Sequence, residues 1–359
     1  MAIQLGINGF GRIGRVSLRA ALERPEQFKI SGVNVRNADL DYLIYMLKYD
    51  SVYGRFNGKL ERYTKGFMVD GVKIPVYGEA EAELIPWSDC GAEYIIDATG
   101  AYVTQEKAVQ HLRAGAKKVI MSAPAKDNIT PTFVYGVNHE LYSTDMNIVS
   151  NASCTTNCLA PLCKVLQDYY GIQMGLMSTI HAATAKQKVV DARSLKDWRT
   201  GRSVFGNVIP SSTGAAKAVG LVIPELQGKM TGISYRVPTA VVSVIDLNVC
   251  LDRPTSYANI CAKIKEASET TMKGVLDCVD DEVVSLDFVG DPHPCIVDVR
   301  EGIALNDKFF KFIAFYDNEW GYVCNLLRML HYMGDVDAGL NKEEPKSAEK
   351  VTTKTSGKR

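Results

Sequence analysis

The first fifteen residues hold the feature that most constrains the fold. Residues 3–7 form a short apolar run typical of a buried strand, and Asn8-Gly9-Phe10-Gly11-Arg12-Ile13-Gly14 follows it at once, before a helix-compatible stretch from Val16. Gly9, Gly11 and Gly14 match G-x-G-x-x-G, in which glycines permit a tight turn, close approach of a pyrophosphate and packing of helix on strand. Glycines that only ease a turn are the alternative, which the strand–turn–helix context disfavours. The segment predicts a Rossmann-type dinucleotide-binding domain.

A second strand is predicted over residues 28–34, where such a domain usually supplies an acidic residue for the ribose of the dinucleotide. Here the strand ends in Asn34-Val35-Arg36-Asn37, and no acid follows until Asp39. The sequence therefore departs from the usual pattern at this loop.

A candidate nucleophile lies in Asn151-Ala152-Ser153-Cys154-Thr155-Thr156-Asn157-Cys158, between an apolar strand and a predicted helix. Cys154 should lie near free backbone N–H groups and the positive end of the helix dipole. Such a position lowers the pKa of a thiol from about 8.5 to roughly 3.5–7.5. The alternative is a small buried hydrophobic residue, the commonest fate of a free cysteine.

A candidate base follows at His181, near the end of the β-branched run 175–184. The four other histidines have weaker contexts: His111 in a polar helix, His139 in a loop, His293 between prolines and His331 in a late helix. A packed structural imidazole is the alternative for His181. Cysteine with histidine is the pair that nucleophilic catalysis requires.

Length and composition set broad limits. The 359 residues suggest two domains, with 46% hydrophobic and 23% charged residues and a formal net charge of zero. We therefore expect no bulk attraction to nucleic acid, and no apolar run approaches a membrane span. The nine cysteines lack metal-like clustering, so we expect no metal site and a reducing compartment, the cytoplasm. Because a strand begins by residue 3, we expect no signal peptide.

Two domains and a tail are predicted along the chain. Strands and helices alternate over residues 1–153, as in a parallel sheet, and strand ends at Asp97-Ala98-Thr99-Gly100 and at Ser122 should border its ligand crevice. Residues 154–319 contain longer β-rich segments, which predict an α+β domain with a mixed, largely antiparallel sheet. Residues 336–359 are polar, and the composition of the last eighteen cannot bury enough surface to order them. A solvated tail is the simplest interpretation, with a docking role as the alternative.

The chain resembles the phosphorylating glyceraldehyde-3-phosphate dehydrogenases over almost its whole length. The resemblance rests on ordered matches at residues 8–15, 49–51, 122–124, 153–157, 181, 212–217, 236–239 and 316–319. It implies a homotetrameric glycolytic and gluconeogenic enzyme that uses NAD to convert D-glyceraldehyde 3-phosphate and inorganic phosphate to 1,3-bisphosphoglycerate. It also implies that a helix at about 320–335 returns to the first domain.

The same resemblance implies roles for individual residues. Cys154 attacks the aldehyde and carries a thioester, and His181 takes the proton. Thr184 and Arg236 bind the substrate phosphate, whereas Ser153, Thr155, Thr213 and Gly214 bind the attacking phosphate. The implied cofactor-binding residues are Asn8, Gly9, Phe10, Gly11, Arg12, Ile13, Gly14, Thr99, Gly100, Ser122, Asn318 and Tyr322.

Departures from the family leave alternatives open. Val35 stands where the family has its ribose-binding aspartate, and Arg193 where a proline is usual, so Arg36 and Arg193 could accept a 2′-phosphate and NADP use is possible. Erythrose-4-phosphate dehydrogenase, a sibling that hydrolyses its thioester, is an alternative function, although Thr184 and residues 211–214 favour the triose enzyme. A third alternative is a binding protein without catalytic activity, which the presence of both Cys154 and His181 disfavours.

Overall fold

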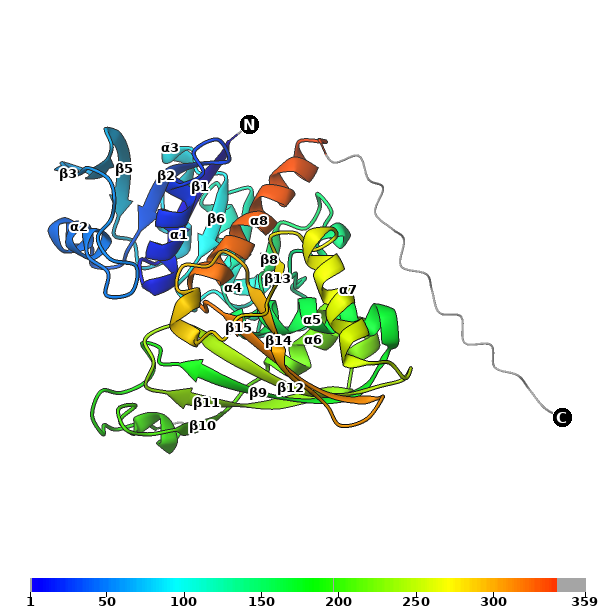
Figure 1. Cartoon of the computed structure of the whole chain (residues 1–359). Helices are drawn as coiled ribbons and strands as arrows, with labels where there is room; N and C mark the ends of the chain where they lie inside the picture. The colour runs from blue at the N-terminus through cyan, green and yellow to red at the C-terminus, as the bar shows by residue number, and fades with distance from the viewer. Residues whose placement is uncertain (1, 196, 341–359) are drawn as a thin grey trace.

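A computed structural model describes residues 2–195 and 197–340, which build two β-sheets with helices packed on them (Figure 1). The strands of the first sheet are β1 (Ile3–Asn8), β2 (Phe28–Asn34), β3 (Leu60–Tyr63), β4 (Gly66–Val69), β5 (Val72–Tyr77), β6 (Tyr94–Asp97), β7 (Lys118–Met121) and β8 (Ile148–Ser150). Those of the second are β9 (Ile172–Ala182), β10 (Ile209–Ser212), β11 (Met230–Val237), β12 (Ser243–Leu251), β13 (Leu276–Val279), β14 (Cys295–Ala304) and β15 (Phe309–Tyr316).

The α-helices alternate with the strands of the first sheet and cover one face of the second. They are α1 (Arg12–Leu22), α2 (Leu40–Lys48), α3 (Trp87–Cys90), α4 (Gln105–Arg113), α5 (Cys154–Tyr170), α6 (Ala215–Val222), α7 (Tyr257–Glu269) and α8 (Trp320–Asp337). Short 3-10 turns occur at Ala82–Leu84, His139–Leu141, Trp198–Gly201, Pro224–Leu226 and Ser285–Phe288.

The first sheet has the strand order β3-β4-β5-β2-β1-β6-β7-β8, and the strands from β5 to β8 are parallel. This confirms the predicted Rossmann-type architecture. The antiparallel run β3-β4-β5 extends one edge, which the expected alternation of strand and helix did not anticipate. All these strands are short, and those at the centre are buried on both faces, as parallel sheets require.

The second sheet has the order β10-β11-β9-β12-β15-β14-β13. Four of its six strand pairs are antiparallel, and β9–β11 and β13–β14 are parallel, which confirms a mixed, largely antiparallel sheet. Its strands alternate buried and partly exposed residues, most regularly in β12, because α5, α6 and α7 pack on one face only.

Helix α8 runs back along the first sheet and beside α1 (Figure 1). Its buried side chains, among them Val323, Leu327 and Leu330, join the core formed by β1, β2 and α1. The helix continues to Asp337, so residues 336 and 337 belong to its last turn. The rest of the tail predicted over residues 336–359 lies outside the described residues from residue 341 onward.

Candidate active site

A cavity of about 420 Å³ lies where the two sheets meet. Its walls come from the start of α1, the segments after β6 and β7, the start of α5, the ends of β9 and β11, and the start of α8. The lining residues are Arg12, Ile13, Ala98, Ser122, Ala123, Pro124, Ser153, Cys154, His181, Thr184, Ala185, Lys186, Arg236, Asn318, Glu319 and Tyr322. The carboxyl ends of parallel strands thus border the cavity, as is usual for ligand crevices in open α/β sheets.

Cys154 is the first residue of α5, directly after a sharp turn. Ala152 has a positive φ of 54°, unusual for a residue with a side chain, and its carbonyl oxygen accepts a hydrogen bond from the Tyr322 hydroxyl at 3.2 Å. Ser153 caps the helix, because its Oγ accepts the backbone N–H of Thr156 at 3.1 Å. The predicted helix start is therefore present, and it presents the half-buried Cys154 to the cavity.

His181 faces Cys154 from the end of β9. Its Nε2 lies 3.6 Å from the Cys154 Sγ, within the range for a contact involving sulfur. The carbonyl oxygen of Ala182, 2.8 Å from its Nδ1, favours a proton on that nitrogen, whereas the Arg236 Nη1, a donor 2.7 Å from the same nitrogen, favours a lone pair there. The structure therefore brings the predicted nucleophile and base together.

Arg236 is paired with His181 across the parallel strands β9 and β11. Its Nη1 lies 2.7 Å from the His181 Nδ1, where it competes with the Ala182 carbonyl and opposes a second proton on the ring. Burial and this guanidinium together lower the pKa of His181 to about 4. The Arg236 Nε is buried without a hydrogen-bond partner among the described residues, which suits a missing anion.

The electrostatics of Cys154 differ from the expectation. Burial raises the pKa of its thiol, whereas Arg236, Thr155 and nearby backbone N–H groups lower it without overcoming the burial. The predicted lowering of this pKa is therefore wrong for the unliganded protein, because the apolar surroundings penalise a thiolate more than the helix start stabilises it. With the pKa of His181 also lowered, both groups are neutral near pH 7.

Thr155 does not line the cavity. It is buried, and its Oγ1 shares a 3.0 Å hydrogen bond with the Tyr316 hydroxyl, which also contacts the Thr179 Oγ1 at 2.9 Å. The Tyr316 ring lies edge-on to His181, with the ring centroids 6.1 Å apart. Thr155 thus holds Tyr316 beside His181, and its hydroxyl is hydrogen-bonded within the protein. The order of apolar and hydroxyl residues in the sequence did not predict that the hydroxyls of Thr155, Thr179 and Tyr316 would meet.

The remaining expected phosphate ligands separate into two places. Ser153 and Thr184 line the cavity, and the Thr184 hydroxyl bonds the Gln187 Oε1 at 2.8 Å. Thr213 and Gly214 precede α6 and do not line it. They lie near the start of α5, because the Thr156 hydroxyl donates to the Ala215 carbonyl at 3.5 Å. Lys186, which the sequence did not mark as a ligand, lines the cavity as a further cation.

The glycine-rich turn fits a dinucleotide. A Cβ on Gly14 would come within 1.9 Å of the Gly9 carbonyl oxygen, and Gly9 itself has a φ of +92° and packs against Thr99. A Cβ on Gly11 would meet nothing within 4 Å, which leaves the approach to the backbone open. Helix α1 has no side-chain cap and no acidic residue in its first turn, so its N–H groups are free for an anion.

Some of the other residues expected to bind the cofactor line the cavity, whereas others contact residues of the protein itself. Ile13, Ser122, Asn318 and Tyr322 line the cavity, and Gly100 has a positive φ of 69°. The Asn318 Oδ1 accepts from the Ser243 Oγ at 3.0 Å. Phe10 is buried, with its ring centroid 6.2 Å from that of Phe67, and the side chains of Asn8 and Thr99 bond Asp97.

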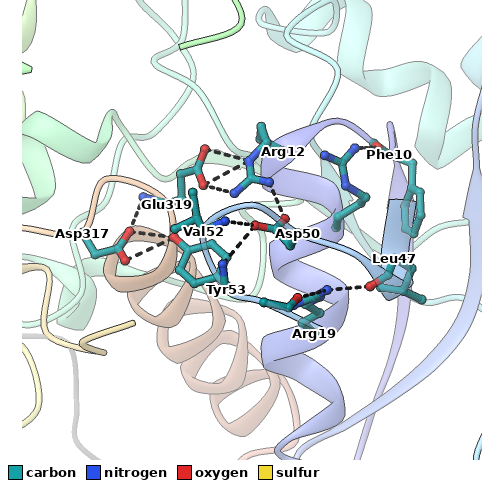
Figure 2. A network of polar contacts seen from close by, with 11 residues as sticks. Phe10, Arg12, Arg19, Leu47, Asp50, Val52, Tyr53, Asp317 and Glu319 are labelled. Atoms are coloured by element: carbon teal, nitrogen blue, oxygen red, sulfur yellow. Dashed lines mark hydrogen bonds and ion pairs between the residues drawn. The ribbon is translucent and has the colours of Figure 1, made fainter. Parts of the chain in front are cut away.

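Arg12 anchors a polar network that crosses between the two halves of the molecule (Figure 2). Its Nε donates to Glu319 at 3.0 Å and its Nη1 to Asp50. The Asp50 Oδ1 accepts the backbone N–H groups of Val52 and Tyr53, and the Tyr53 hydroxyl donates to Asp317 at 2.9 Å. Burial alone would lower the pKa of Arg12, but Glu319 and Asp50 raise it above its ordinary value. The segments 49–51 and 316–319, which resemble the family in sequence, thus supply Asp50, Asp317 and Glu319 to this network.

The loop that departs from the family lies after β2. Val35 is half-buried against the first core and donates its N–H to the Tyr77 carbonyl at 2.9 Å, whereas Arg36 and Arg193 are exposed. Neither arginine lines the cavity.

The described residues contain neither a membrane-spanning helix nor a metal-binding cluster. Within residues 2–195 and 197–340, every helix is too short or too polar to cross a lipid bilayer. In the same residues no group of three or more His, Cys, Asp or Glu side chains is placed to hold a metal ion.

Comparison with known proteins gives consistent matches along the chain. Residues 3–105 match the family model described as the NAD binding domain of glyceraldehyde 3-phosphate dehydrogenase, and residues 153–318 match that of its C-terminal domain. Glyceraldehyde-3-phosphate dehydrogenase 2 of Mucor circinelloides f. lusitanicus is 53% identical over 338 residues, 94% of this chain and 99% of that protein. The Schizosaccharomyces pombe protein of the same name is 53% identical over 94% of this chain and 100% of its own. The cytosolic protein of Gracilaria gracilis is 53% identical over 89% and 94%.

Proposed function

Because the chain belongs to the glyceraldehyde-3-phosphate dehydrogenase family, we propose that it oxidises D-glyceraldehyde 3-phosphate through a thioester on Cys154. The products are 1,3-bisphosphoglycerate and reduced NAD, with inorganic phosphate as the second substrate. The observation that carries this proposal is the 3.6 Å contact between the Cys154 Sγ and the His181 Nε2, at the start of a helix and in a cavity beside the glycine-rich turn.

The acid–base chemistry follows from two neutral groups. As the Cys154 sulfur attacks the aldehyde carbon, the His181 Nε2, in the tautomer with its proton on Nδ1, takes the thiol proton and returns it to the carbonyl oxygen, which becomes the hydroxyl of a thiohemiacetal. The backbone N–H groups at the start of α5, beside Cys154, stabilise the developing oxyanion in this proposal. His181 then removes the hydroxyl proton during oxidation, so one imidazole serves both steps.

The residues expected to hold NAD are those of the turn 9–14, with Thr99, Gly100, Ser122, Asn318 and Tyr322. When bound, NAD accepts the hydride lost by the thiohemiacetal carbon. Inorganic phosphate then attacks the thioester carbonyl carbon, the Cys154 sulfur leaves and regains a proton, and an acyl phosphate is released. Arg236 and Thr184 at the cavity wall bind the phosphate ester of the substrate in this proposal, and Ser153, which also lines the cavity, binds the attacking phosphate.

The test is a cofactor-reduction assay with D-glyceraldehyde 3-phosphate and with erythrose 4-phosphate, each with and without inorganic phosphate. We expect rapid NAD reduction with the triose, dependent on phosphate. Faster, phosphate-independent turnover of the tetrose would replace the proposal with the erythrose-4-phosphate alternative, which the names of the relatives do not favour.

The nucleophile is tested by limited alkylation. Of the nine free cysteines, Cys154 lines the cavity, whereas Cys158, one helical turn further, is buried. Because the His181 Nε2 can take the thiol proton as the sulfur reacts, a stoichiometric alkylating agent should label Cys154 first and abolish activity, and Cys154→Ser should be nearly inactive yet still bind NAD. Labelling of Cys158 with activity preserved would refute the assignment.

A homotetramer in the cytoplasm is proposed on separate grounds. The outer face of β9 exposes Met174 and Leu176, at 58% and 62%, and the segment after it exposes Leu195 and Trp198, at 77% and 85%. Such apolar surface on a soluble chain usually marks an interface. The relative named cytosolic and the nine free cysteines support the compartment. Sedimentation analysis showing a stable monomer would refute the tetramer. With zero net charge, nucleic acid is not expected as the main partner.

A further inference from the structure

A buried polar chain joins the carboxyl ends of three neighbouring strands beneath the glycine-rich turn. Asn34, Asn8 and Asp97 are the last residues of β2, β1 and β6, and the sheet register places them side by side. The Asn34 Nδ2 donates to the Asn8 Oδ1 at 2.9 Å, and the Asn8 Nδ2 donates to the Asp97 Oδ2 at 2.8 Å. All three side chains are at most 3% exposed, so water contributes little to their pairing.

Asp97 carries this chain into the next loop. Its Oδ1 accepts the backbone N–H of Thr99 at 3.2 Å and the Thr99 hydroxyl at 2.8 Å. The Thr99 side chain in turn packs against Gly9, where a Cβ would come within 2.9 Å of its methyl group. The position of the Asp97 carboxylate therefore sets how two loops of the expected dinucleotide site meet.

His111 completes the coordination of Asp97 from α4, and nothing in the proposed chemistry uses it. The ring is fully buried, and its Nδ1 accepts a hydrogen bond from the Trp87 indole Nε1 at 3.1 Å. An indole nitrogen can only donate, so Nδ1 carries the lone pair and the proton lies on Nε2. That nitrogen lies 3.2 Å from the Asp97 Oδ2, and the bond consequently runs from His111 to the carboxylate.

We propose that His111 is a positioning residue for dinucleotide binding: its Nε2–H holds the Asp97 carboxylate in the orientation that seats Thr99 against Gly9. The inference rests on the proposed function, because it assumes that this turn binds NAD. Without the donor, Asp97 loses one of four hydrogen bonds and its side chain can rotate in the buried site. The Thr99–Gly100 loop then loses its fixed position beside Gly9.

Two amide variants separate this role from simple packing. His111→Gln places its amide near Nε2, so it can donate to Asp97 but loses the bond with Trp87. His111→Asn places its amide near Nδ1, so it keeps the Trp87 bond and loses Asp97. A structural role predicts similar damage from both, whereas the proposal predicts an asymmetry in NAD affinity.

The readout is the dissociation constant for NAD by titration calorimetry without substrate. We expect His111→Asn to weaken NAD binding about tenfold, as loss of a hydrogen bond to a charged group does, and His111→Gln and the control Trp87→Phe to stay within about threefold of the native protein. The alkylation rate of Cys154 should be unchanged in all three. Equal dissociation constants for the Asn and Gln variants would overturn the proposal.

Two further outcomes are informative. If His111→Asn does not fold, Asp97→Asn carries the test: it should also weaken NAD binding about tenfold, and unchanged affinity would overturn the inference. If the native protein binds NAD but does not oxidise the triose, the proposed function is refuted. The role of His111 is then decided by the NAD dissociation constants of its variants alone. A native protein that binds no NAD refutes both.

Discussion

At the scale of single residues, the site depends on the thiol of Cys154 and the imidazole of His181, both of which are neutral near pH 7. The sequence placed Cys154 and His181 correctly at the ends of secondary-structure elements, because N-caps and β-branched runs are local signals. It could not predict their electrostatics, since burial and the cross-strand neighbour Arg236 are set by the fold. The expected thiolate therefore forms only as His181 takes its proton.

His181→Asn should keep the fold and lower kcat by about a hundredfold or more, because a general base is lost. In the native enzyme the pKa of His181 is about 4, below its ordinary value of 6.5, so the ring stays neutral and able to accept a proton as the pH falls from 7 to about 5. The kcat/KM profile, which reports the free enzyme and the free substrates, should therefore show no inflection near pH 6.5 beyond that of the substrate phosphates. Such an inflection, absent from His181→Asn, would contradict the buried, neutral imidazole.

Val35 decides a second residue-scale question, the choice of cofactor. It has no carboxylate to bond the ribose hydroxyls, and exposed Arg36 follows it directly. Val35→Asp should tighten NAD binding by about 1.5–3 kcal/mol and repel NADP. Steady-state kinetics with both cofactors on the two proteins measure the preference. If the NAD/NADP ratio is the same in both, position 35 does not face the ribose.

At the scale of elements, the strand–turn–helix unit was predictable because its glycines have local steric reasons. Gly9 needs a positive φ, and Gly14 lets α1 touch the backbone of the preceding turn. The antiparallel strands β3 to β5 were not predicted, because an alternating pattern of elements does not reveal hairpins inserted at a sheet edge. The polar chain through Asn8, Asp97 and His111 was missed as well, because its partners meet only when the strands align.

Gly14→Ala and Gly11→Ala form a matched pair on this unit. The new methyl at position 14 would lie 1.9 Å from the Gly9 carbonyl oxygen, so the helix must move away and both the melting temperature and NAD affinity should fall. At position 11 the methyl meets no protein atom within 4 Å, so the melting temperature should hardly change while NAD binding weakens. Calorimetry and thermal melts of both variants measure this. Normal NAD affinity in Gly11→Ala would show that no ligand approaches there.

At the scale of the whole molecule, the cavity exists because two separately built sheets are held together. Helix α5 starts after the last strand of the first sheet and packs on one face of the second sheet. Helix α8 follows the second sheet in the chain and packs against the first sheet. The network of Arg12, Asp50 and Glu319 adds polar contacts at the same junction (Figure 2). Length and composition indicated two domains, but they could not indicate which charged residues meet between them, since Arg12 and Glu319 are 307 residues apart in the chain.

Glu319→Gln tests whether this junction contributes to stability. The Glu319 side chain is 14% exposed and Arg12 is 28% exposed, so their attraction is screened less than that of a surface pair, and removal of the charge leaves Arg12 with Asp50 alone. We expect a loss of about 1–2 kcal/mol and a melting temperature about 2–4 °C lower. Glu61→Gln is the matched control, because its pair with Lys59 is 42% and 72% exposed and should contribute almost nothing. Differential scanning calorimetry compares the two, and equal melting temperatures would mean that apolar packing of α8 alone holds the halves together.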